Sequence, residues 1–230
     1  MLSSTVVKRA AGSRKRRPIR EDRPPLPEQL EINANAADDL YDLRRHIRGM
    51  LANDSITVLR GNSHVPGDLS LDLDDEDGCD GTIVDGDLEV TGSIINRASE
   101  LGSFLLVTGN VRAKNLIAGC AQIVVLGDLV IDEVIIGFGR RGSVAVHGDT
   151  RARAIITEHH PFELRGRIEG ITVSGRGRIT EDDHFRSYAP ALVDDVLAAG
   201  GPPGGHPDRD RTAEAILAGR PVLREGVVLN

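Results

Sequence analysis

The sequence is poor in aromatic residues and cysteine, and it contains no tryptophan. Among 230 residues there are four phenylalanines, two tyrosines and two cysteines. The cysteines, Cys79 and Cys120, lack the spacing of paired zinc ligands, so we expect a small loop residue and a small core residue rather than a metal site. So few aromatic side chains suit a thin core built from aliphatic residues.

Long apolar runs are also absent. The chain has no stretch of about eighteen apolar residues, which predicts no transmembrane helix. No basic start leads into an apolar stretch, which predicts no secretory signal. We therefore expect a cytoplasmic protein.

Basic residues are concentrated at the start of the chain. Residues 1–28 carry eight Lys or Arg and three acids, a net charge of +5, so the rest must carry −12 to give the overall −7. This composition predicts a disordered basic arm over residues 1–30, either a solvated leader or a contact for a membrane or another anionic partner. The acidic body has no aromatic residues among its basic ones, which argues against specific nucleic-acid binding.

A Gly-Asp pair, or a close variant of it, recurs at steps of 19, 23, 18, 21 and 18 residues. The pairs are Gly67-Asp68, Gly86-Asp87, Gly109-Asn110, Gly127-Asp128, Gly148-Asp149 and Gly166-Arg167. The residue two before each glycine is apolar, and the residues two and four after it are mostly so, with polar residues between them. This alternation predicts strands with one buried face, and a repeat of this length predicts a solenoid.

A third apolar element follows most of the glycines by seven to nine residues, for example Leu116-Ile117 and Ile155-Ile156. Each repeat therefore predicts three short strands, the composition of one rung of a parallel β-helix. We expect an all-β protein of about six rungs, with inward columns such as Val107, Val125 and Val146. Because the rung length varies through insertions after the third strand, a right-handed, three-faced coil is favoured over the stricter left-handed hexapeptide helix.

The flanks of the repeat have helical patterns. Helical spacing from about Ala36 to Leu51, with Asn33 or Asn35 as N-cap, predicts a helix that covers the open end of the core. Short helices after Pro190 either close the other end or pack on a flank. We therefore divide the chain into a basic arm (1–30), a capping helix with a first strand (31–64), the β-helix (65–180) and a C-terminal appendage (181–230). Covered ends predict a protein that does not polymerise end to end.

Histidines are the main candidates for a catalytic or metal-binding role, which is the alternative to a protein without such a site. His159 and His160 lie beside Glu158, His184 follows two aspartates, and His147 precedes a corner glycine. Adjacent histidines on an extended segment point to opposite sides, and nothing in the sequence brings these groups together. We predict no catalytic residue, no cofactor and no metal, with a zinc site or transferase centre at His147, His159 or His160 as the alternative.

The inserted corners near Arg97–Phe104 and Phe138–Gly142 are better candidates for protein contact. They are expected to stack on one edge of the coil, and arginines beside an apolar ring are typical of interfaces. The candidate partner-binding residues are Phe104, Phe138, Arg140 and Arg141.

The segment Leu105–Leu116, with echoes at Ile123–Leu129 and Val144–Ala154, resembles bacterial polymer-forming cytoskeletal proteins of the bactofilin type and their β-helical relatives. The resemblance implies a right-handed, three-faced β-helix without cofactor or catalytic residues. This chain departs from that pattern by helical segments on both sides and longer corners. We expect a non-enzymatic bacterial interaction or scaffolding module. The alternatives are a filament-forming protein, a β-helix transferase or zinc enzyme, and a toxin-neutralising or defence component.

Overall fold

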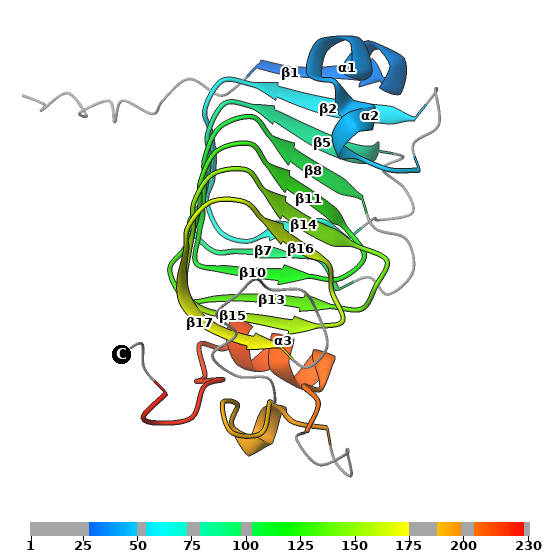
Figure 1. The fold of residues 1–230 in the computed structure, drawn as a ribbon. Helices are drawn as coiled ribbons and strands as arrows, with labels where there is room; N and C mark the ends of the chain where they lie inside the picture. The colour runs from blue at the N-terminus through cyan, green and yellow to red at the C-terminus, as the bar shows by residue number, and fades with distance from the viewer. Residues whose placement is uncertain are drawn as a thin grey trace, which may run out of the picture.

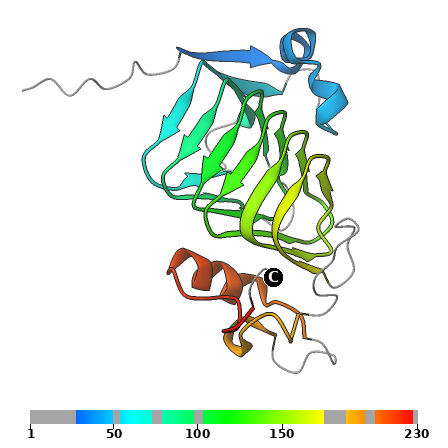
Figure 2. The ribbon, with the colours of Figure 1, turned by 60° about the vertical axis from the view of Figure 1, so that its left-hand side comes forward.

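The computed structural model describes residues 28–49, 54–72, 79–97, 103–174, 188–198 and 205–227. The predicted basic arm up to residue 27 lies outside these ranges, as do His184 and the two aspartates before it. The described chain forms a parallel β-helix with an N-terminal and a C-terminal appendage, shown in Figures 1 and 2. The predicted fold class is therefore confirmed.

The coil has three faces. The first face is six parallel strands: β2 (Ser55–Arg60), β5 (Cys79–Asp85), β8 (Phe104–Val107), β11 (Gln122–Val125), β14 (Ser143–Val146) and β16 (Phe162–Leu164). The second comprises β3 (Ser63–Val65), β6 (Leu88–Val90), β9 (Val111–Ala113), β12 (Leu129–Ile131) and the first part of β15 (Thr150–Glu158). The third comprises β4 (Leu69–Ser70), β7 (Ser93–Ile95), β10 (Asn115–Ala118), β13 (Val134–Phe138) and the second part of β15. Strand β17 (Ile168–Ser174) pairs with both parts of β15.

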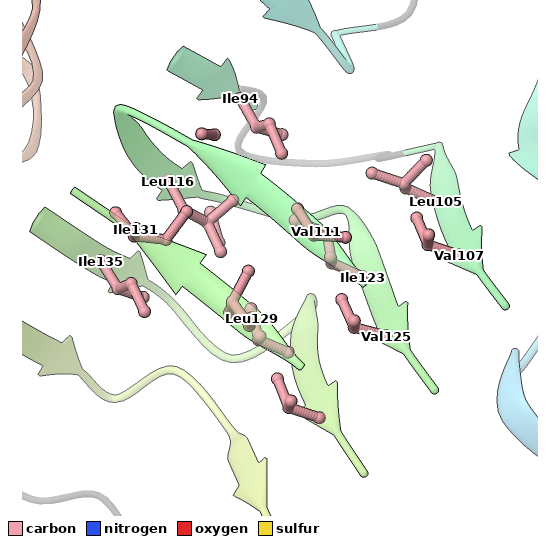
Figure 3. Packing of buried hydrophobic residues seen from close by; sticks show 14 of the residues in the cluster. Ile94, Leu105, Val107, Val111, Leu116, Ile123, Val125, Leu129, Ile131 and Ile135 are labelled. Atoms are coloured by element: carbon pink, nitrogen blue, oxygen red, sulfur yellow. The ribbon is translucent and has the colours of Figure 1, made fainter. Parts of the chain in front are cut away.

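One narrow aliphatic core runs through the coil. Val125 pairs with Val107 on one side and Val146 on the other, and all three side chains are fully buried. Figure 3 shows part of this core, to which the three faces contribute Leu, Ile and Val side chains that point inward. The predicted inward column is thus confirmed. Since each rung buries its apolar side chains against its neighbours, stability is collective.

The first rung is displaced from its predicted register. Val65 pairs with Val90 of the second face, and Leu59 is the residue that pairs with Val84 of the first. The counterpart of Gly86 is therefore Gly61, whereas Gly67 belongs to the next corner of the rung. The coil accordingly begins at β2, before the boundary predicted at residue 65.

The residues beside the corner glycines form a ladder of hydrogen bonds between rungs. At each step a side-chain oxygen accepts from the backbone N–H of the equivalent residue one rung later, over 2.8–3.0 Å. The ladder runs through Asn62, Asp87, Asn110, Asp128 and Asp149 to Arg167. Each of these side chains thus bonds the backbone of the next rung rather than that of its own corner. We call this column the corner ladder.

Close stacking explains most of the corner glycines. A Cβ added at Gly127 would lie 2.5 Å from the Asn110 side chain and 2.6 Å from the Gly109 carbonyl oxygen. Gly109, Gly127, Gly148 and Gly166 do not have the left-handed backbone conformation that favours glycine. At these four corners glycine is needed for the close approach of successive rungs.

The N-terminal appendage consists of β1 (Glu28–Asn33), α1 (Ala34–Tyr41) and α2 (Leu43–His46). The predicted N-cap is confirmed, since the Asn33 side chain accepts from the backbone N–H of Ala36. The predicted position of the helix over the open end is wrong. The helices pack on the outer side of the first face, against Ile83, Leu106 and Val124 among others.

The N-terminal end of the core is bounded by β1, which pairs antiparallel with β2. Gln29 pairs with Leu59 and Glu31 with Thr57, so the two polar side chains lie on the same side of the sheet as the core. Beside them is a cleft of about 490 Å³ that is lined by inner side chains of the first rungs, including Leu59, Val65 and Leu71. No residue of α1 or α2 lines this cleft.

The C-terminal appendage covers the outer side of the third face (Figure 2). It contains a short 3₁₀ helix, η1 (Asp194–Val196), and helix α3 (Arg209–Leu217). Ala213, Ile216 and Leu192 pack with Ile136 and Ile156 of the coil. Of the two predicted positions, flank or end, the structure shows the flank. Two of the three faces thus carry a cover made by the chain itself, whereas the second face presents charged residues such as Glu89 and Arg112.

Candidate functional site

Two of the four predicted contact residues are buried. Phe104 is 3% exposed and packs beneath the N-terminal helices, and Phe138 is 5% exposed and packs beneath the C-terminal appendage. Their prediction as protruding anchors is therefore wrong, because each ring lies on an outer side of the coil that an appendage covers. The sequence reasoning had placed both phenylalanines on uncovered corners.

Arg140 and Arg141 are exposed, as predicted, at the corner between β13 and β14. They line a cleft of about 620 Å³ between this corner and the start of α3, and we call it the corner cleft. Its lining is Cys120, Phe138, Gly139, Arg140, Arg141, Glu158, Pro207, Asp208, Arg209 and Asp210. The coil and the C-terminal appendage therefore build the cleft together.

The carboxylates of the corner cleft already have partners. Asp208 is the N-cap of α3, where its Oδ1 accepts from the backbone N–H of Arg211 at 3.0 Å. Asp210 lies 3.4 Å from the Nε of Arg209. Arg140 and Arg141 have no hydrogen bond or ion pair within the described residues. The lining carries three arginines and three carboxylates, and Arg140 and Arg141 are the two of these six charged groups for which the described residues supply no partner.

Glu158, a residue of the cleft lining, lies beside two histidines. Its Oε1 lies 3.5 Å from His159 Nε2 and 3.8 Å from Nδ1 of His206, which belongs to the appendage. His159 has a left-handed backbone, with φ of 56°. The sequence reasoning missed His206, because its isolated position in a glycine- and proline-rich loop gives no signal.

Across the described ranges, no group of three or more His, Cys, Asp or Glu is arranged to hold a metal ion.

His160 points to the other side, as expected for adjacent histidines, and is buried. Its Nδ1 donates to the carbonyl oxygen of Phe138 at 3.2 Å, while Nε2 is buried without a partner. Burial lowers the pKa of His160 to about 4, although backbone hydrogen bonds at Phe138 and Gly139 raise it in part. The imidazole packs over Gly137, where an added Cβ would lie 2.6 Å from the ring. His160 is a neutral packing residue.

The buried imidazole should make stability depend on pH. An unfolded chain binds the proton at the ordinary pKa near 6.5, whereas the folded chain binds it only near 4. Stability contributed by the neutral ring is therefore complete above pH 6.5 and is lost as the pH falls to about 4, a change of about 3 kcal/mol. Urea unfolding across this range should show the loss in the wild type and a shallower pH dependence in His160→Phe.

Equal slopes in the wild type and in His160→Phe would contradict this assignment of the proton.

His147 lies elsewhere, on the first face beside His46 of α2, with ring centroids 5.5 Å apart. Burial lowers the pKa of both histidines, and Arg165 adds to the effect at His147. The histidines considered as an alternative catalytic or zinc centre are thus distributed over a buried packing site, the edge of the corner cleft and the outer side of the first face.

Within the described part of the chain, no helix is both long enough and apolar enough to cross a bilayer. Comparison of the chain with protein-family models, with curated proteins and with solved structures finds no match.

Proposed function

We propose that this protein is a non-enzymatic interaction module, in which the β-helix is a rigid scaffold and the corner cleft receives a partner protein. One observation carries the proposal. The carboxylates of the cleft are engaged within the chain, whereas Arg140 and Arg141 have no partner among the described residues. Exposed guanidinium groups at the rim of a concave surface are frequent in protein interfaces.

The architecture of the coil supports a scaffolding role. Parallel rungs hydrogen-bonded above and below, together with the corner ladder, fix the position of each corner relative to the next. The two appendages cover the apolar outer sides of the first and third faces, and the corner cleft lies where the C-terminal appendage meets the coil. A rigid support lowers the entropy cost of ordering a binding surface.

Site-specific cross-linking tests the proposal. A photoreactive benzoylphenylalanine replaces Asp210, an exposed residue of the cleft, or Glu89, an exposed residue of the second face. In the cells of origin, the probe at 210 should form a discrete adduct with another protein, identified by mass spectrometry. The double change Arg140→Gln and Arg141→Gln should remove this adduct.

The probe at 89 should form no such adduct. Equal adducts from both positions, or none at 210, would refute the corner cleft as the contact surface.

A filament-forming protein is the second candidate, and the cleft at the first rung favours it because inner apolar side chains contribute to its lining. Leu59, Val65 and Leu71 line an opening that a neighbouring molecule could cover. Against it, β1 runs antiparallel to the coil and presents Gln29 and Glu31 on the core side, which does not continue a parallel stack. We therefore expect negative-stain images to show discrete particles, and fibres would favour this second candidate.

A further inference from the structure

We infer that the corner cleft binds an acidic, extended segment of the partner protein. This inference rests on the proposed function and specifies the chemistry of the partner. It starts from the shape of the cleft, which lies between the β13–β14 corner and the start of α3. Phe138, Cys120 and Pro207 give the lining an apolar part, and the guanidinium groups of Arg140 and Arg141 lie exposed beside it.

The arginines determine the charge of the occupant. Two adjacent guanidinium groups without partners among the described residues can each bind a carboxylate through paired hydrogen bonds. The cleft can therefore bind two carboxylates, one at each arginine that has no partner among the described residues.

The fixed carboxylates of the lining select the kind of anion. Asp208 caps α3 and cannot move away from an incoming ligand without losing its hydrogen bond to Arg211, and Glu158 lies in the same lining beside His159 and His206. A continuous chain of phosphates, or a flat anionic bilayer, would meet these negative charges as well as the arginines. Spaced carboxylates on a peptide can reach Arg140 and Arg141 while apolar residues contact the Phe138 side of the cleft. This pattern favours an acidic peptide that contains apolar residues.

Peptide binding to the full-length protein tests the inference. The probe is a fluorescein-labelled peptide, Glu-Asp-Leu-Glu-Asp-Leu-Glu-Asp, and its neutral counterpart is Gln-Asn-Leu-Gln-Asn-Leu-Gln-Asn. Fluorescence anisotropy should detect binding of the acidic peptide alone. Binding should weaken as salt rises from about 0.05 M to about 0.5 M, because screening shortens the range of the charge interaction.

Two double variants with the same change in net charge separate the site from the general field of the protein. Arg140→Gln with Arg141→Gln removes the two unpaired groups and should weaken binding by about tenfold for each group removed. Arg151→Gln with Arg153→Gln removes two exposed arginines outside the corner cleft, Arg151 on the second face and Arg153 where β15 turns to the third face, each paired with a glutamate. This control should keep the dissociation constant within about twofold. Thermal unfolding followed by circular dichroism should give equal melting temperatures for the Arg140→Gln, Arg141→Gln variant and the wild type. Neither arginine has a hydrogen bond or ion pair among the described residues.

Three results would overturn the inference: no binding of the acidic peptide, equal loss of binding in both double variants, or binding of phosphatidylserine vesicles in place of the peptide with the same dependence on Arg140 and Arg141. If the cross-link at residue 210 forms while the peptide does not bind, the interaction module stands and the partner is not acidic. If both experiments fail, the proposed function fails as well.

Discussion

Replacing Val125 with Asp is expected to abolish soluble, folded protein. The side chain is fully buried between Val107 and Val146 in the inner column, where no cation or hydrogen-bond donor compensates a carboxylate. An unpaired buried charge costs several kcal/mol, a large part of the about 5–15 kcal/mol that stabilises an ordinary domain. Because the rungs support one another, the loss should spread along the coil. The soluble fraction and the circular dichroism spectrum of the expressed variant measure it.

Val130→Asp, five residues later, is the matched control. Val130 is half-buried on the outer side of the second face and pairs with Arg112 on one neighbouring strand and Arg151 on the other. A carboxylate there faces two cations across the strands, so the variant should fold with a stability close to that of the wild type. Similar yields and spectra for the two aspartate variants would mean that the inward register is wrong.

Phe138→Ala should destabilise the protein by about 3–5 kcal/mol, the usual loss for removing a buried phenylalanine. The ring is 5% exposed and packs with the apolar residues of the C-terminal appendage. Its truncation leaves a cavity at the junction that also forms the corner cleft. The free energy of unfolding in urea measures the effect.

Arg141→Ala, three residues away at the same corner, should change the free energy of unfolding by less than about 0.5 kcal/mol, as is usual for surface substitutions. Arg141 is exposed and has no hydrogen bond or ion pair among the described residues. Equal stability of the two alanine variants would contradict the burial of Phe138 and restore its interpretation as a protruding anchor. The pair therefore separates the residues that build the cleft from those available to a partner.

The inner side of the coil could be predicted from sequence because inward residues alternate with polar ones. Arg112 between Val111 and Ala113 is one such case, and the structure buries both apolar neighbours and exposes the arginine. The alignment of the Gly-Asp pairs failed at the first rung because two different corners of the coil make the same hydrogen bond between rungs. Asp68 accepts from the backbone N–H of Ser93 just as Asp87 accepts from that of Asn110, so a Gly-Asp pair does not identify its corner.

The sequence contains a signal for the covers over the outer sides of the coil. Strand β8 reads Phe-Leu-Leu-Val and all four side chains are buried, so both its sides are apolar. Uninterrupted apolar strands of this kind indicate burial on both faces, which places the N-terminal helices on the flank rather than over the end. The corner cleft could not be predicted in the same way. Glu158 and His206 meet only because the appendage folds back onto the third face, and no local pattern records that contact.

The corner ladder also explains why the last repeat breaks the Gly-Asp rule. Arg167 receives the bond of Asp149 through its backbone N–H and needs no side-chain acceptor, because no further ladder bond begins there in the described chain. Each internal turn thus carries its own side-chain acceptor beside its glycine, and Arg167 is the last residue of the ladder in the described chain. Deleting or duplicating one internal turn would therefore leave an intact ladder, so the coil can change its length by whole turns.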